Sequence, residues 1–212
     1  MACPSQAGMK THRSLKILSV SDIIDPSLTR QVEEKTLESV DLIISCGDLP
    51  PEYLSFLRDR LEKPLFYVKG NHDIRYTAHN PVGCTNIHGR VILFNSIKIL
   101  GLEGSMWYNG GENQYRDSEM KKIIRGLWFS ILKKGKVDIV VTHAPPRHVH
   151  DAEDLCHMGF ESFNRLIEKR KPRFLIHGHI HKPFKTHEER ITRIGSTKVM
   201  NTCGYTIFEA AP

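Results

Sequence analysis

Residues 65–73 are Leu-Phe-Tyr-Val-Lys-Gly-Asn-His-Asp, which is a short apolar run followed by a group of polar side chains. A run of aromatic and β-branched residues that is closed by a glycine is typical of a buried strand ending in a tight turn. The same arrangement recurs at residues 42–48, where the apolar run ends in Cys-Gly-Asp. These two segments predict strands that present Asp, Asn or His where they end.

Further apolar runs are followed by residues of the same kind: 15–20 by Asp22, 137–142 by His143, and 173–177 by the Gly-His-Ile-His of residues 178–181. In open α/β sheets, ligand sites form at the carboxyl ends of the strands. We therefore expect the five strand ends to converge on one site.

Amphipathic segments alternate with these predicted strands. The spacing of their apolar residues predicts helices over residues 29–40, 52–61, 118–134 and 160–169. Residues 91–100 predict a hairpin, and residues 185–209 alternate like short antiparallel strands. This order predicts an α/β fold that contains mixed sheets.

The 212 residues suit one sizeable core, so we expect a flexible leader over residues 1–14 and a single domain over 15–212. No apolar run is long enough to span a bilayer, and the leader lacks the apolar centre of a secretory signal. Five cysteines, an odd number with no Cys-x-x-Cys pair, argue against a disulfide framework. We therefore expect a cytoplasmic protein without membrane association.

The chain is basic, with a formal net charge of +6, and it contains 12 histidines. A positive surface favours anionic partners such as phosphate esters or nucleic acid. Net charge also serves solubility, so it does not choose between these partners. The histidines point to chemistry only where they stand beside other ligand-type residues.

The residue types at the predicted strand ends suit metal ions. Carboxylate, imidazole and amide oxygen bind Mn, Fe or Zn, and no thiolate is required. Six candidates are too many for one tetrahedral ion, and they suit two ions that share a bridging carboxylate and a bridging water. The candidates are Asp22, Asp48, Asn71, His143, His179 and His181.

The motifs Gly47-Asp48, Gly-Asn-His-Asp (residues 70–73), His143 and Gly-His-Ile-His (residues 178–181) occur in this order. They resemble the motifs of the calcineurin-like metallophosphoesterase superfamily, over about residues 15–209. The resemblance implies a four-layer α/β/β/α sandwich. In such a sandwich two mixed β-sheets face each other and the helices lie outside.

The resemblance also implies which residues hold which ion. Asp48 would bridge two divalent ions, with manganese as the first expectation and iron or zinc as alternatives. Asp22 and His181 would hold the first ion. The second site would be completed by Asn71, His143 and His179.

The implied reaction is metal-assisted hydrolysis of a phosphate ester. A hydroxide bridging the two ions would attack phosphorus in line. His72 would act as a general acid or a transition-state donor near the phosphoryl group, and Asp73 would orient His72. No covalent enzyme intermediate is implied.

One position departs from the family pattern. The first family motif is usually Asp-x-His, but residue 24 is isoleucine, which cannot bind a metal. The first site would therefore be weak. Asp25 is the nearest substitute ligand, but an Asp followed by Pro26 is also typical of a helix N-cap, and we favour the cap.

Several residues near the motifs are candidates for binding the substrate. Arg147 and His150 lie in the loop after His143, and Arg75 follows the Gly-Asn-His-Asp motif. The aromatic residues Trp107 and Tyr108 could form a wall for a base or a sugar, although ordinary loop packing also accounts for them.

Three functions remain open at this point. The first is a phosphoesterase that acts on a small phosphate ester or nucleotide, with a diester favoured over a monoester because so short a chain leaves little room for a capping domain. The alternative is a metal- or phosphate-binding module with weak or no catalysis, which Ile24 favours. A nuclease is the third, although no aromatic and basic array for single strands is evident. The sequence predicts neither the natural substrate nor the oligomeric state.

Overall fold

A computed structural model describes residues 13–211 apart from residues 38, 78, 128–130, 132–134 and 183. Most of the expected leader, residues 1–12, lies outside the described residues. So do residues 128–130 and 132–134 of the expected helix over 118–134. The described part contains two large sheets and a small two-stranded one.

The first sheet has five strands in the order β13-β1-β2-β3-β4. β1, β2, β3 and β4 run parallel, and β13 pairs antiparallel with β1. The carboxyl ends of the parallel strands therefore meet at one edge. The bounds are β1 Leu15–Ser21, β2 Leu42–Ser45, β3 Leu65–Tyr67, β4 Thr85–Asn86 and β13 Gly204–Ala210.

The second sheet has six strands in the order β11-β12-β10-β9-β6-β5. Its four central strands are parallel, and β11 and β5 pair antiparallel at the two edges. β5 and β6 form the expected hairpin. The bounds are β5 Arg90–Phe94, β6 Ile97–Leu102, β9 Ile139–Thr142, β10 Phe174–His177, β11 Ile191–Ile194 and β12 Thr197–Asn201.

The remaining elements are helices and short connections. In the described part of the chain, four α-helices, two 3-10 helices and one small sheet lie outside the two large sheets. The bounds are α1 Pro26–Glu33, α2 Pro51–Leu61, α3 Asp117–Gly126, α5 Glu161–Arg170, η1 Asp73–Thr77, η2 Glu188–Arg190, β7 Ser105–Met106 and β8 Gln114–Tyr115.

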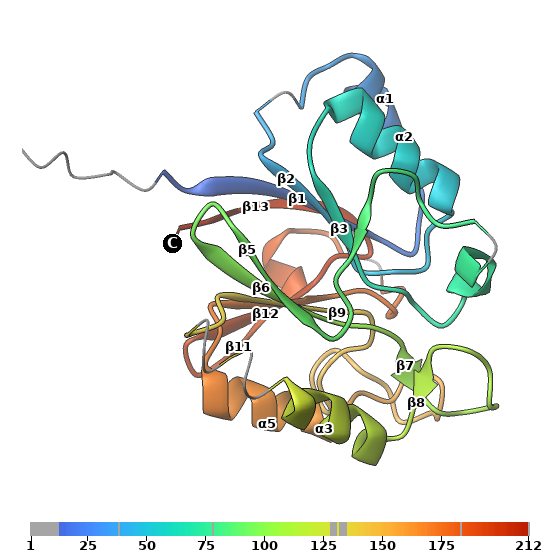
Figure 1. The fold of residues 1–212 in the computed structure, drawn as a ribbon, viewed down its shortest axis with the longest axis vertical. Coiled ribbons are helices and arrows are strands. Elements are labelled where there is room, and N and C mark those ends of the chain that lie inside the picture. The colour runs from blue at the N-terminus through green and yellow to red at the C-terminus, as the bar shows by residue number, and fades with distance from the viewer. Residues whose placement is uncertain are drawn as a thin grey trace, which may run out of the picture.

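Figure 1 shows four layers of secondary structure from top to bottom, and three clusters of buried apolar side chains lie between them. One core lies between the sheets and contains Ile17 of β1 and Val141 of β9. A second packs the other face of the first sheet on α1 and α2, and includes Leu18. The third packs the second sheet on α3 and α5, and includes Val140. Neighbouring residues of one strand thus enter different cores, which is why the central strands are continuously apolar. The expected four-layer sandwich is confirmed.

Helix α1 is shorter than the sequence predicts. It begins at Pro26 rather than Thr29, and it ends at Glu33 rather than Val40. The side chain of Asp25 accepts hydrogen bonds from the amides of Ser27 (2.8 Å) and Leu28 (3.3 Å), which makes Asp25 the N-cap. Lys35 has a φ of 57°, and this left-handed residue prevents the helix from continuing.

Replacing Asp25 tests its role as a cap. We expect Asp25→Ala to lower the free energy of unfolding by about 1 kcal/mol, because two amides of the first turn lose their acceptor. Urea denaturation followed by circular dichroism measures the change, and Glu33→Ala on the exposed side of the same helix is the matched control. Unchanged stability combined with the loss of one bound metal ion would instead identify Asp25 as a ligand.

A candidate metal centre at the strand ends

Side chains that follow β2, β3, β9 and β10 meet at one point between the two sheets. Nε2 of His143 lies 3.2 Å from Oδ2 of Asp48, 3.0 Å from Oδ1 of Asn71 and 3.1 Å from Nδ1 of His179. The His143 side chain is fully buried, and Asn71 and His179 are almost so. The structure therefore brings four of the six predicted ligands together, two from each sheet.

Hydrogen bonds behind the rings decide which atoms face this point. Nδ1 of His143 donates to the carbonyl of Cys46 (2.8 Å), and Nε2 of His179 donates to the carbonyl of Cys156 (2.7 Å). Because a carbonyl can only accept, the neutral rings direct their lone pairs at each other. Asn71 donates its amide N–H to Tyr108, so its oxygen also faces inward. Four acceptors thus surround one position, and such a set requires a cation or a proton between its members.

The charges of this group are strongly coupled. Burial alone lowers the pKa of His143, but the Asp48 carboxylate outweighs burial and raises the pKa of His143 to about 9. Burial raises the pKa of Asp48, but His143 brings the pKa of Asp48 down to about 2. Burial and the charge of His143 lower the pKa of His179 to about 4. The position between these side chains therefore favours positive charge, and a divalent ion would satisfy the same acceptors.

A second group of ligand-type side chains consists of Asp22, His181 and Cys203. One ligand atom from each of them lies within 4.8 Å of the other two. The Asp22 side chain is fully buried, and its Oδ1 lies 3.3 Å from Nε2 of His181. Cys203 follows β12, so the rule that found the other strand ends also applies to it. The alternating pattern of residues 185–209 predicts strands but does not by itself single out this cysteine.

His179 connects the two groups. Its backbone amide donates to both carboxylate oxygens of Asp22 (3.0 Å each), while its ring faces His143. The amide of Asp22 in turn donates to the carbonyl of Gly47, the residue before Asp48 (3.1 Å). The six predicted ligands therefore lie in two adjoining groups.

The backbone at this site is unusual. Asp22, Asp48 and His179 all have positive φ values, of 64°, 57° and 67°. Such left-handed conformations cost about 1 kcal/mol or more for a residue with a side chain, and they tend to cluster at functional sites. Gly178 lies so close to Asp22 that a Cβ atom there would overlap the Asp22 carboxylate. Close packing thus holds the carboxylate in place.

The two predicted catalytic residues have different surroundings. His72 is exposed, and its amide donates to Oδ1 of Asp48 (2.8 Å). Asp73 is buried, and its Oδ2 accepts from the amides of Asp48 and Gly70 (2.8 Å each). The expectation that Asp73 orients the His72 ring stays a prediction. In the described residues its carboxylate bonds to backbone amides and ties the two loops together.

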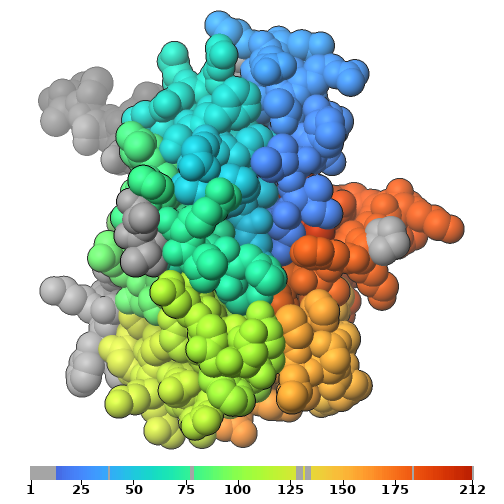
Figure 2. Space-filling view, turned by 90° about the vertical axis from the view of Figure 1, so that its right-hand side faces the viewer, coloured from blue at the N-terminus to red at the C-terminus, as the bar shows by residue number. Residues whose placement is uncertain are grey.

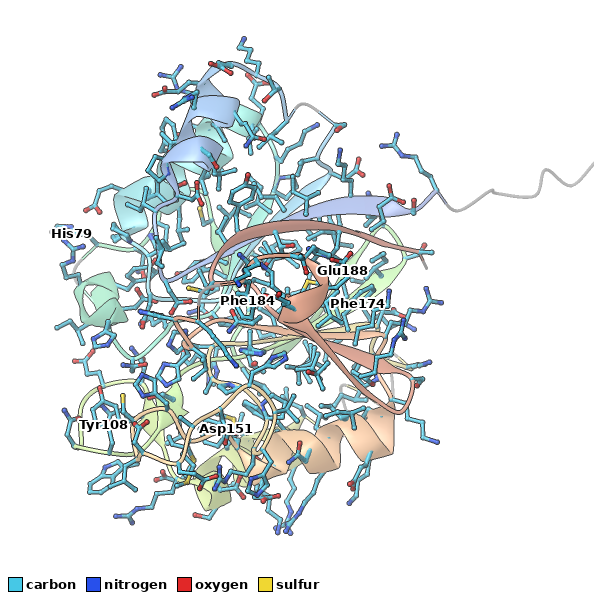
Figure 3. All side chains as sticks on the ribbon, turned by 180° about the vertical axis from the view of Figure 1, so that it is seen from behind. His79, Tyr108, Asp151, Phe174, Phe184 and Glu188 are labelled. Carbon is cyan, nitrogen blue, oxygen red and sulfur yellow. The ribbon has the colours of Figure 1, made fainter. Side chains whose placement is uncertain are left out.

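Two of the three predicted substrate-binding residues are bonded to the protein itself. The Arg147 guanidinium pairs with Asp151 (2.7 Å) and Glu153 (2.6 Å). The ring of His150 bonds to His177 (2.8 Å) and Thr192 (2.9 Å). These bonds stabilise the loop that carries Asp151 (Figure 3), and both side chains have partners within the protein. Arg75 is exposed in η1, and substrate binding by Arg147, His150 and Arg75 stays a prediction.

The rim of the site contains residues whose contacts the sequence did not predict. The ring of His157 packs on that of His179 with 5.4 Å between centroids, and Nδ1 of His157 bonds to Asp154 (2.9 Å). Tyr108 reaches Asn71 from the loop after β7. Figure 2 looks onto the edge of the molecule where these segments, far apart in the sequence, adjoin.

Among the described residues, no helix combines the length and the apolar character that crossing a membrane requires.

Comparisons with known proteins agree with this arrangement. An uncharacterised protein of Haemophilus influenzae is 27% identical, in a match that covers 76% of this chain and 82% of that protein. The crystal structure of TT1561 of Thermus thermophilus is similar, with a TM-score of 0.61 at 16% identity. The match covers 94% of this chain and 99% of that chain, and it shows a shared fold. The family model for calcineurin-like phosphoesterases matches residues 15–183, which is most of the chain. The chain therefore belongs to the calcineurin-like phosphoesterase family.

Proposed function

We propose that this protein is a metal-dependent hydrolase of phosphate esters that prefers phosphodiesters. The observation that carries the proposal is the group of four acceptor atoms from Asp48, Asn71, His143 and His179. Hydrogen bonds on the outer side of each imidazole direct these acceptors inward, as is usual for metal-binding histidines. The donor set of carboxylate, amide oxygen and imidazole fits Mn, Fe or Zn.

The second group supports a binuclear centre. Asp22 and His181 adjoin the first group, because the backbone amide of His179 donates to both carboxylate oxygens of Asp22 and Nε2 of His181 lies 3.3 Å from Oδ1 of Asp22. We assign Asp48 as the residue shared by both ions. When bound, the ions would activate water for attack on phosphorus and neutralise charge on the phosphoryl oxygens.

His72 is the residue best placed to move a proton. Its amide is anchored on Asp48, while its side chain is exposed at the edge of the site. An imidazole in this position can donate a hydrogen bond to the leaving oxygen and pass it a proton. Asp73 contributes indirectly, because it holds the amides of Asp48 and Gly70 in place.

The surroundings of the site favour a diester over a monoester. A monoester carries close to two negative charges near neutral pH, whereas a diester carries one and has a second organic group. The guanidinium of Arg147 is already paired with Asp151 and Glu153, and that of Arg190 already donates to a backbone carbonyl. Ile23 and Ile24, next to Asp22, are 48% and 44% exposed, and they offer an apolar surface to an organic substituent.

A binding module with weak or no catalysis is the second candidate. The isoleucine at position 24 supports it, because this side chain supplies no ligand to the first ion. Turnover separates the two candidates, since a binding module holds metal without hydrolysing an ester.

The test of the proposed function measures hydrolysis of bis(p-nitrophenyl) phosphate and p-nitrophenyl phosphate after loading with Mn²⁺, Fe²⁺ or Zn²⁺. We expect the diester to be preferred by at least about tenfold in kcat/KM and chelation to abolish turnover. Asp48→Ala should lose both bound metal and turnover, whereas Asp59→Ala on the surface of α2 should keep both. Retained metal and activity in Asp48→Ala, or a preference for the monoester, would contradict the proposal.

Replacement of His72 separates catalysis from metal binding. We expect His72→Ala to bind the same number of metal ions as the wild type and to lower kcat by about 10²–10⁴, because the leaving oxygen loses its proton donor. His79→Ala, which removes another exposed histidine, is the matched control. A kcat equal to that of the wild type would remove His72 from the chemistry.

Gly178→Ala tests the contact that fixes Asp22. The added methyl group overlaps the Asp22 carboxylate, so we expect the variant to bind one metal ion fewer than the wild type. Metal content after dialysis measures this, with Gly126→Ala, where a Cβ meets nothing within 4 Å, as the control. Full metal content in Gly178→Ala would show that the first ion does not depend on Asp22.

A further inference from the structure

Strand pairing places Cys203 beside Asp22. β1 and β13 pair antiparallel with Ser21 opposite Gly204. One step forward along the chain from Ser21 is Asp22, and one step back from Gly204 is Cys203, so these two residues leave the sheet as neighbours. The sulfur of Cys203, a carboxylate oxygen of Asp22 and a ring nitrogen of His181 lie within 4.8 Å of one another.

The backbone of Cys203 is held on both sides. Its amide donates to Oδ1 of Asn201 (2.9 Å), and the Asn201 amide group donates to the carbonyl of Ile180, between His179 and His181 (2.9 Å). The carbonyl of Cys203 accepts from Arg190 (2.8 Å). Arg190 also packs on the ring of Phe184, which is labelled in Figure 3 (4.7 Å). The position of the sulfur is thus coupled to the same segment that presents His181.

Burial distinguishes this thiol from an ordinary surface cysteine. Cys203 is 7% exposed and the Asp22 side chain is fully buried, whereas the His181 side chain is 60% exposed. Cys203 and Asp22 therefore form the buried side of the group, and His181 forms the side that faces solvent. Among the described residues, no side chain or carbonyl accepts a hydrogen bond from the Cys203 thiol, whereas the Cys84 thiol donates to the carbonyl of Val82. A buried thiol that points at a carboxylate and an imidazole is well placed to share a cation with them.

We propose that Cys203 binds the metal ion of the first site as a thiolate, together with Asp22 and His181, and thereby replaces the ligand that Ile24 does not supply. This inference rests on the proposed function only in that it requires a metal ion at Asp22 and His181. When the metal–sulfur bond forms, the S–H bond breaks, the sulfur donates the electron pair and the proton leaves to solvent. No atom changes its oxidation state in this step.

The thiolate changes the expected metal preference of the first site. Sulfur and imidazole ligands favour Zn²⁺ and Fe²⁺, whereas Mn²⁺ prefers oxygen. Together with the shared Asp48, the first ion would have two carboxylates, one imidazole and one thiolate, so a metal-bound water would be its fifth ligand. The first site should thus select zinc or iron, although the sequence made manganese the first expectation for both sites.

Cobalt reports a thiolate ligand directly, because Co²⁺ bound to sulfur has an intense charge-transfer absorption in the near ultraviolet. The experiment titrates the metal-free full chain with Co²⁺ and counts bound ions by equilibrium dialysis. We expect the absorption to appear in the wild type and in Cys84→Ser, and to be absent in Cys203→Ser. The first ion should bind at least about tenfold more weakly to Cys203→Ser, whose fold is checked by circular dichroism.

The outcomes separate this inference from the proposed function. If the wild type binds two cobalt ions without showing the absorption, Cys203 is not a metal ligand, and the proposed hydrolase activity is unaffected. This result does not depend on whether a variant folds. An absorption that persists in Cys203→Ser would overturn the role of Cys203 as well. If the absorption appears but the protein does not hydrolyse phosphodiesters, the role of Cys203 as a metal ligand is supported and the proposed hydrolase activity is contradicted. A chain that binds no cobalt would overturn both.

Discussion

The contact between Asp48 and His143 is the interaction on which the site depends. Asp48 follows a strand of the first sheet and His143 follows a strand of the second, so their 3.2 Å contact joins the two layers at one edge. The second nitrogen of His143 bonds to the carbonyl of Cys46, which adds a further link between the sheets. Because both side chains are nearly or fully buried, neither can move away without leaving a charge unpaired in the interior. Asn71 and His179 both contact the same nitrogen of His143 that faces Asp48.

The loops around the contact are held by polar groups that do no chemistry of their own. Asp73 bonds to amides of two loops, and Arg147 closes the loop after β9 through Asp151. His177 lies fully buried behind the site and bonds to His150. A rigid surrounding of this kind lets ligand residues keep left-handed backbone conformations that would otherwise relax.

The parts of the structure that depend on local sequence were predicted well. The apolar runs that became β1, β2, β9 and β10, and the polar residues after them, follow from strand periodicity and turn chemistry. Interactions between distant residues were not predictable in this way. Nothing near Arg147 or His150 in the sequence distinguishes a phosphate ligand from a partner of Glu153 or Thr192. The contact of Cys203 with Asp22 was not predictable for the same reason, since the two are far apart along the chain and only the pairing of β1 with β13 brings them together.

That pairing also has a consequence for the order in which the molecule assembles. β1 is the first strand of the described chain and β13 is the last. They pair antiparallel along their whole length, from Leu15 opposite Ala210 to Ser21 opposite Gly204. Contacts between such distant segments form slowly, because a long loop must close before they are gained. During synthesis, the edge of β1 that pairs with β13 therefore stays unpaired until nearly all of the described chain has left the ribosome. Asp22 and Cys203 become neighbours only through this pairing, so the site that we propose for the first ion is complete only after β13 has joined the sheet.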